Sequence, residues 1–238
     1  MTNHTLAEKL VATLPSGLPG LFNPWTDRGE DDTDWNAPQA RLARLAAHLD
    51  CEPEFVIVGE ASGYLGMRRS ALAFTSERQL MEGAIPRVAP PPGRLTTRRL
   101  PYSESSATIV WKNLKLLGIA ERTVMWNALP MHPFKPGNAD SNRTPTDAEL
   151  MLGAPAMRLL ANSFPRTKIV AVGRKSEALL LAMGIRTVGQ VRHPANGGAN
   201  EFSAGLAALM DDAHLKLDGK PARAGAGRVA IPGGHIHL

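Results

Sequence analysis

Four short apolar runs, separated by stretches with helical periodicity, constrain the fold of this 238-residue chain most strongly. Strands that alternate with helices form parallel sheets, because parallel neighbours need a long crossover connection. The sequence therefore predicts an α/β fold: a three-layer sandwich with a central four-stranded parallel sheet flanked by helices. The runs, each rich in strand-forming residues, are Phe55–Val58, Val124–Leu129, Ile169–Val172 and Thr187–Val191.

Capping residues and apolar spacing indicate the helices around these strands. A capping-box pattern ends at Glu149, and Pro155 is expected to kink or split the helix that follows it. The proline-rich segments 84–102 and 133–145 are predicted loops. Helices are expected over Leu6–Leu14 and Ala37–Leu49, with further helix starts at Ser105, Thr146, Ser176 and Ser203.

Composition and the length of the apolar runs predict the domain organisation and the location of the protein. Residues 1–217 are expected to form one domain, followed by a flexible tail over 218–238 that is rich in Gly, Ala, Arg and Pro. No run reaches the roughly 18–20 apolar residues of a membrane helix, and Met1–Leu14 lacks the apolar stretch of a secretory signal. We therefore expect no membrane partner and a cytoplasmic location.

Cysteine content and net charge indicate what the chain binds. Cys51 is the one cysteine, so the chain has neither an internal disulfide nor a cysteine cluster for a metal. His235 and His237 in the tail are too few to form a metal site, and we expect no metal and no cofactor. The net charge of +5 and the pI near 9.7 favour a polyanionic partner such as nucleic acid.

Polar residues follow the predicted strands where each strand ends. The first strand runs into Glu60, the second contains Asn127 near its end, and the fourth is followed by His193. In an open parallel sheet, ligands bind outside the carboxyl ends of the strands. A carboxylate, a carboxamide and an imidazole from distant parts of the chain are therefore expected at one rim.

Each of these residues also has an ordinary structural interpretation. Glu60 suits a solvated turn, Asn127 a turn or cap, His193 a structural histidine and Phe74 the core. The turn 59–66 is not a phosphate-binding loop, because no Gly-Lys-Ser/Thr follows, and its glycine spacing does not fit a dinucleotide fingerprint. The convergence of the three polar groups, rather than any one motif, predicts the site.

Together the motifs resemble the uracil-DNA glycosylase superfamily. Gly59-Glu60-Ala61-Ser62-Gly63 looks like the Gly-Glu-Ala-Pro-Gly of the thermostable iron–sulfur family, with Ser62 in place of proline. The continuation to Phe74 looks more like the single-strand-selective monofunctional family, and segment 127–149 again looks like the thermostable one. His193-Pro194-Ala195 is similar to the second catalytic motif, and the likeness spans about residues 55–209.

The sequence also departs from these families. The iron–sulfur cysteines are absent, and the acidic or amide residue that other families place after the glutamate position is replaced by Ala61. Glu60 is left as the candidate for activating water. The tyrosine that excludes thymine in the most studied family falls at Gly63, so exclusion of a methyl group must come from elsewhere or be incomplete.

The resemblance implies a monofunctional glycosylase, typically a monomer, that cuts uracil from single- or double-stranded DNA and leaves an abasic site and free uracil. Phe74 would stack on the base, Asn127 would read its edge, and His193 would donate to O2 as the bond breaks. Glu60 would position water or stabilise the sugar cation. The residues expected to contact uracil through the first turn are Ala61, Ser62 and Gly63.

Cations and small residues near the motifs are expected to contact DNA: Arg68, Arg69, Arg192, Asn196, Gly197, Gly198 and Asn200. Arg94, Arg98 and Arg99 in the first proline-rich loop also suit phosphates, although exposed arginines are more often plain surface. Relatives often carry a bulky residue after the histidine motif. The glycine tip at Gly197 therefore predicts weak retention of abasic product and no strong preference for duplexes.

Two other functions remain open from the sequence. One is a catalytically weak or idle homologue that binds damaged or abasic DNA, which the replacement at Ala61 keeps open. The other is a different enzyme on the same type of fold, such as a nucleoside or nucleotide hydrolase that ignores DNA.

Overall fold

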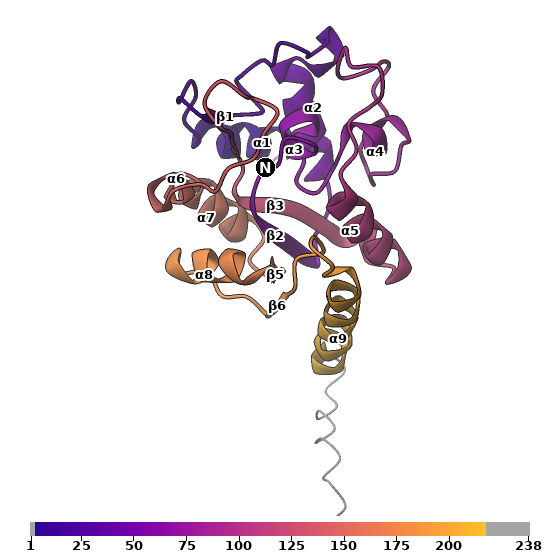
Figure 1. The fold of residues 1–238 in the computed structure, drawn as a ribbon. Coiled ribbons are helices and arrows are strands. Elements are labelled where there is room, and N and C mark those ends of the chain that lie inside the picture. The colour runs from indigo at the N-terminus through magenta and orange to yellow at the C-terminus, as the bar shows by residue number, and fades with distance from the viewer. Residues whose placement is uncertain (1–2, 218–238) are drawn as a thin grey trace, which may run out of the picture.

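Four parallel strands form the centre of the structure, a computed structural model that describes residues 3–217 (Figure 1). β2 (Phe55–Ala61) lies between β3 (Thr123–Leu129) and β5 (Lys168–Val172), and β6 (Gly189–Val191) pairs with β5 at the other edge. The predicted tail over 218–238, with its two histidines, lies outside the described residues. The predicted four-stranded parallel sheet is confirmed.

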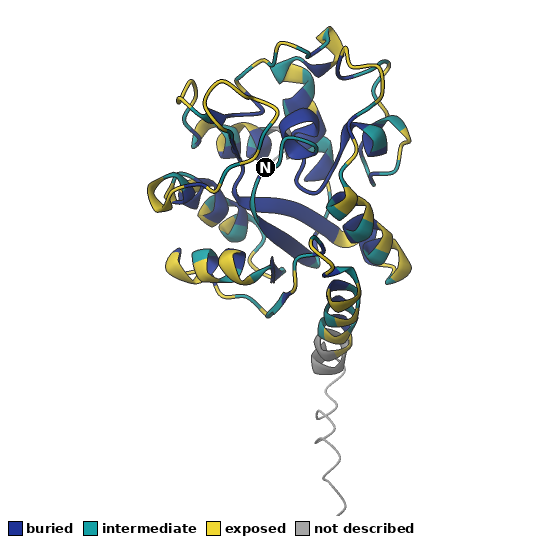
Figure 2. Ribbon diagram, viewed as in Figure 1, coloured by how far each residue is buried: buried dark blue, intermediate teal, exposed yellow. Residues whose placement is uncertain are grey.

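The central strands are apolar and buried along almost their whole length. All seven residues of β3 are buried, as are the first five of β2, and both strands run through the middle of the molecule in Figure 2. A strand covered on both faces reads as a continuous apolar run, because neither face contacts water. This is why short runs such as Phe55–Val58 could be recognised in the sequence.

Helices cover both faces of the sheet. In Figure 1, α7 and α8 lie on one side and α5 and α9 on the other, which gives the predicted three layers. No helix within residues 3–217 is long and apolar enough to cross a membrane. The helices are α1 (Asn3–Ala12), α2 (Pro38–His48), α3 (Met67–Ser70), α4 (Glu77–Met81), α5 (Ser105–Leu116), α6 (Asp147–Met151), α7 (Ala154–Ser163), α8 (Arg174–Ala182) and α9 (Ala199–Leu217), with short 3-10 turns at Asp34–Asn36 and Ala120–Arg122.

The local signals located most helix boundaries. Thr146 accepts a hydrogen bond from the Glu149 amide in the predicted capping box, and the helix is split between α6 and α7, just before Pro155. Three predicted starts are late: α1 begins at Asn3 rather than Leu6, α8 at Arg174 rather than Ser176, and α9 at Ala199 rather than Ser203. Instead of capping α8, the Ser176 hydroxyl donates to the Val58 carbonyl at 2.7 Å and anchors that helix to β2.

The last strand is shorter than predicted. Thr187 and Val188 lie outside β6, which begins at Gly189, and Val188 is 49% exposed. A side chain on Gly189 would come within 2.5 Å of Leu209 Cδ2, so the glycine allows α9 to pack directly on this edge strand.

Arg68 and Arg69 are core residues rather than the DNA contacts predicted from the sequence. The Arg68 guanidinium lies over the Phe22 ring, 4.0 Å from its centroid, and hydrogen-bonds His132 Nδ1 at 3.3 Å. Arg69 forms ion pairs with Asp31 and Asp140. Both arginine side chains are buried, so neither presents its charge to a phosphate backbone.

These contacts give the N-terminal loop 27–34, which is rich in Asp and Glu, a structural role. β1 (Leu21–Phe22) pairs with β4 (His132–Pro133), which joins the N-terminal segment to the loop after β3. Asp32 forms a buried ion pair with Arg41 of α2. Loop 27–34 therefore supplies carboxylates to buried arginines, since a buried charge is stable only when it is paired.

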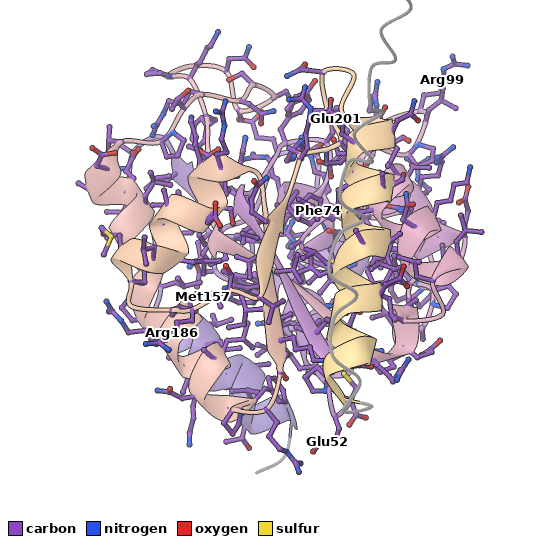
Figure 3. The ribbon with its side chains drawn as sticks, turned by 90° about the horizontal axis from the view of Figure 1, so that it is seen from below. Glu52, Phe74, Arg99, Met157, Arg186 and Glu201 are labelled. Carbon is purple, nitrogen blue, oxygen red and sulfur yellow. The ribbon has the colours of Figure 1, made fainter. Side chains whose placement is uncertain are left out.

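We expect Arg69→Met to lower the free energy of unfolding by about 3 kcal/mol, because it leaves two carboxylates without their cation. Urea unfolding followed by circular dichroism measures this loss. Arg99→Met, at an exposed arginine (Figure 3), is the matched control and should change stability by less than about 0.5 kcal/mol. Equal stability of the two variants would contradict the structural role of Arg69.

Candidate active site at the carboxyl ends of the strands

A cavity of about 830 Å³ opens where β2, β3, β5 and β6 end. The chain passes from β2 to β3 on one side and later returns to β5 on the other side of β2. The strand order therefore reverses at β2, and such a switch point leaves a crevice beyond the carboxyl ends of the strands. The cavity lies at the place where an open α/β sheet binds its ligand.

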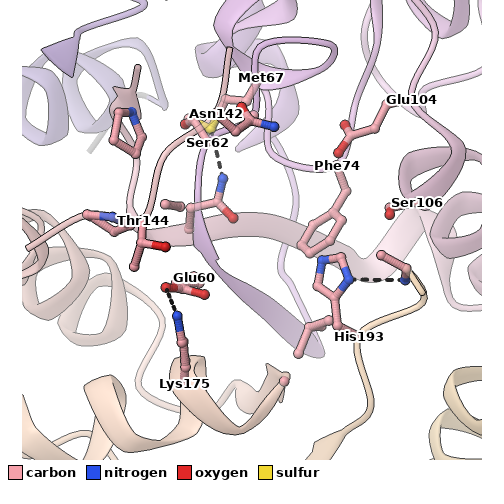
Figure 4. Close-up of a pocket in the computed structure, with 18 of the residues that line it drawn as sticks. Glu60, Ser62, Met67, Phe74, Glu104, Ser106, Asn142, Thr144, Lys175 and His193 are labelled. Carbon is pink, nitrogen blue, oxygen red and sulfur yellow. Dashed lines mark hydrogen bonds and ion pairs between the residues drawn. The ribbon is translucent and has the colours of Figure 1, made fainter. Parts of the chain in front are cut away.

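Glu60 lies near the end of β2 and lines this cavity (Figure 4). Its carboxylate lies 3.4 Å from Nζ of Lys175 in the first turn of α8, and its side chain is 30% exposed. The ammonium partner holds the carboxylate in place without enclosing it. Glu60 thus presents a negative charge that both water and a ligand can reach.

His193 follows β6 and lies across the cavity from Lys175. Its Nδ1 accepts a hydrogen bond from the Ala195 amide at 3.1 Å, so the neutral ring carries its proton on Nε2. Burial lowers the pKa of His193, and the nearby charge of Glu60 raises it in part. The ring is therefore neutral at pH 7 and offers one Nε2–H donor.

Asn127 and Phe74 meet over Gly59. A side chain at Gly59 would overlap Asn127 Oδ1 and come within 2.8 Å of the Phe74 ring, so only glycine fits this position of β2. The Asn127 amide donates to Met67 Sδ at 3.1 Å, which fixes its orientation. Because a thioether is a weak acceptor, the amide remains available to hydrogen-bond a ligand.

Phe74 has a backbone conformation that phenylalanine rarely adopts, with φ at +49°. Its ring is tilted by 38° to His193, with 6.0 Å between the ring centroids. Strained backbone of this kind persists where the surrounding structure imposes it and is common at binding sites. In this conformation the Phe74 ring lies beside both the amide of Asn127 and the imidazole of His193.

The structure brings most of the predicted site residues together. One cavity is lined by Glu60, Ala61, Ser62, Gly63, Phe74, Asn127, His193 and Asn196. Arg192, Gly197 and Asn200 are exposed outside it, and Arg192 pairs with Glu201 at 3.1 Å. Gly198 was also expected to contact DNA, but it is buried against the His193 carbonyl, where no side chain fits.

Several lining residues were not assigned to the site from the sequence. Met67 orients Asn127, and Asn142 Oδ1 accepts from the Tyr64 amide at 3.1 Å, which joins the loop after β3 to the first turn. Glu104 lies just before α5 and is far in sequence from any strand end, so the strand-end rule could not find it. Lys175 follows β5, the third of the predicted strands, and this position is the signal that could have identified it.

Metal-binding side chains do not cluster here. Within the described residues, no group of three or more His, Cys, Asp or Glu side chains is placed to hold a metal ion. What the cavity offers is an aromatic face, an amide, a neutral imidazole N–H and a carboxylate. These groups can bind a flat polar ring and stabilise charge that develops on it.

Comparison with solved structures supports the class of fold, an α/β sandwich. Among solved structures, the chain is similar to wild-type SMUG2 from Pedobacter heparinus, with a TM-score of 0.58 and 15% sequence identity. The match covers 89% of this chain and 98% of that chain. No family model matches the sequence, and no curated protein matches it. At this identity the likeness establishes a shared fold.

We expect the pKa of His193 to lie below 6.5 and to fall further in Glu60→Gln, because the carboxylate that favours the protonated ring is then lost. NMR titration of the imidazole Hε1 resonance measures both values. Glu52→Gln is the control, since Glu52 is exposed and lies before the start of β2, at the end of the molecule opposite the cavity (Figure 3). A His193 pKa that rises in Glu60→Gln would contradict this geometry.

Proposed function

We propose that this protein is a DNA glycosylase that hydrolyses the N-glycosidic bond of deoxyuridine in DNA. One observation supports this most directly: an aromatic face, an oriented amide and a neutral histidine donor line a single cavity at the switch point of the sheet. The fold shared with a SMUG2 protein of the uracil-DNA glycosylase superfamily, together with the motif resemblance, supports the same class of enzyme.

Recognition of the base requires that it leave the helix, because a stacked and paired base is out of reach. In this proposal the ring stacks on Phe74, and base–aromatic stacking is worth about 1–3 kcal/mol. Asn127 accepts from N3–H with Oδ1 and donates to O4 with its amide. Cytosine presents the opposite donor and acceptor pattern at these two atoms, so the amide selects uracil.

Bond cleavage moves the bonding electron pair from C1′–N1 onto the base, which leaves as an anion. The Nε2–H of His193 donates to O2 as this charge develops, and a donor aimed at developing charge is worth about 3–4 kcal/mol. The lowered pKa of His193 suits this role, because a neutral ring donates without first adding charge to the cavity.

The sugar is left electron-poor at C1′. The Glu60 carboxylate stabilises this positive charge and orients a water molecule, which attacks C1′ and gives its proton to the carboxylate or to solvent. The ion pair with Lys175 holds the Glu60 side chain in place at the cavity wall. The products are free uracil and an abasic site.

The DNA backbone requires cations at the cavity mouth, and the buried Arg68 and Arg69 do not supply them. Arg174 and Lys175 line the cavity, and Arg192 lies beside it. Arg98 and Arg99 are exposed on the loop that leads to Glu104. We propose that these side chains contact phosphates and that exposed Asn196, Gly197 and Asn200 lie along the strand.

Excision from a single-stranded oligonucleotide with one deoxyuridine, followed by alkaline cleavage, tests the proposal. We expect wild type to cleave at uracil. We expect His193→Ala and Glu60→Gln to lose about 100-fold or more in rate, and Asn127→Ala to lose selectivity for uracil over cytosine. Glu52→Gln, far from the cavity, should match wild type.

A gel-shift titration with abasic DNA, made alongside the excision assay, distinguishes the alternative function, a homologue that binds damaged DNA without cleaving it. Wild-type protein that binds abasic DNA in a gel-shift titration but cleaves neither single- nor double-stranded substrate would be a damage-binding homologue. A protein that neither binds nor cleaves DNA would refute both the proposed glycosylase and the damage-binding homologue.

A further inference from the structure

The cavity holds a second carboxyl group that the proposed reaction does not use. Glu104 lines the cavity just before α5, with its side chain against the turn 63–66. A side chain at Gly66 would overlap Glu104 Oε2, and one at Gly63 would lie 3.9 Å from Oε1. The two glycines therefore make room for this carboxyl group.

Glu104 differs from Glu60 in having no cation partner among the described residues. No side chain in the described part of the chain hydrogen-bonds or forms an ion pair with its carboxyl group, whereas Glu60 has Lys175. The other titratable or charged groups that line the same cavity are Glu60, Arg143, Arg174, Lys175 and His193. Burial alone raises the pKa of Glu104 to about 7, so the group is largely protonated below neutral pH.

The position of Glu104 relative to a bound base follows from the other contacts. In Figure 4, Glu104 and His193 lie at opposite ends of the Phe74 side chain. A pyrimidine that stacks on Phe74 with O2 at His193 has C2 directed toward that histidine. Because C5 is directly across the ring from C2, the C5 edge is directed toward Glu104 and the turn 63–66.

We propose that Glu104 is a specificity-determining residue that reads the C5 position of the bound pyrimidine, favouring a hydrogen-bonding substituent and disfavouring a methyl group. This rests on the proposed function. A carboxyl group beside C5 can accept from or donate to a hydroxyl, but it loses hydration without compensation when a methyl group covers it. The glycines at 63 and 66 offer no apolar side chain for that methyl group.

The proposal also makes excision depend on pH. Ionised Glu104 would place a negative charge at the edge of a base that itself leaves as an anion, which raises the barrier. The protonated form has no such effect. Excision of uracil should therefore slow as the pH rises through about 7, and the slowing should be absent in a variant that stays neutral.

The test uses single-stranded oligonucleotides that carry uracil, thymine or 5-hydroxyuracil, since methyl and hydroxyl substituents are similar in size. We expect wild type to excise 5-hydroxyuracil at least about 100-fold faster than thymine, measured as kcat/KM. In Glu104→Leu we expect this preference to fall below about tenfold, mainly through faster thymine excision. Glu104→Gln should keep the preference and lose the decline in uracil excision above pH 7.

Glu121→Gln, at an exposed glutamate away from the cavity, is the matched control and should behave as wild type. A 5-hydroxyuracil-to-thymine preference within threefold of wild type in Glu104→Leu would overturn the proposal. If that variant fails to fold, an unchanged pH profile in Glu104→Gln would overturn it instead. Wild-type excision of uracil is read in the same assays, and its absence would refute the proposed function.

Discussion

The buried guanidinium of Arg69 contacts three segments that are far apart in the sequence, two of which lead into the cavity wall. It forms ion pairs with Asp31 of the N-terminal loop and Asp140 of the loop after β3, and donates to Tyr102 Oη at 3.1 Å. Tyr102 lies two residues before Glu104, and Asp140 two residues before Asn142. A planar cation with several donors can satisfy all three partners at once, so one buried charge fixes the N-terminal loop and the two segments that lead to Glu104 and Asn142 in the cavity wall.

A buried carboxylate does the same for the proline-rich loop. Glu77, fully buried in α4, accepts hydrogen bonds from the backbone amides of Leu95, Thr96 and Tyr102 and from Arg94 Nε. Long loops without regular structure are usually either functional or disordered. Here one carboxylate satisfies polar groups that would otherwise need a strand or helix. The loop is therefore ordered, and it leads into α5 with Glu104 facing the cavity.

These two clusters explain what the sequence could and could not predict. The strands and the convergence of Glu60, Asn127 and His193 follow from local patterns and from the rule for parallel sheets. The burial of Arg68 and Arg69 does not, because their partners are distant in sequence and a pair of arginines reads the same whether solvated or paired. Glu104 was missed for a related reason: its place depends on the path of a loop with no periodicity.

The two carboxyl groups of the cavity differ in their surroundings, and in the proposed reaction this difference matters. Glu60 lies beside the ammonium group of Lys175, where, in the proposed reaction, its negative charge stabilises a cationic sugar. No cation of the described residues pairs with Glu104, and burial raises its pKa to about 7; in the proposed complex it lies at the base edge, where negative charge would oppose departure of an anionic base. Environments that separate two carboxyl groups in this way assign them different roles. In the proposed reaction the negative charge of Glu60 therefore lies on the sugar side, while the base side carries an acid that is largely protonated below neutral pH.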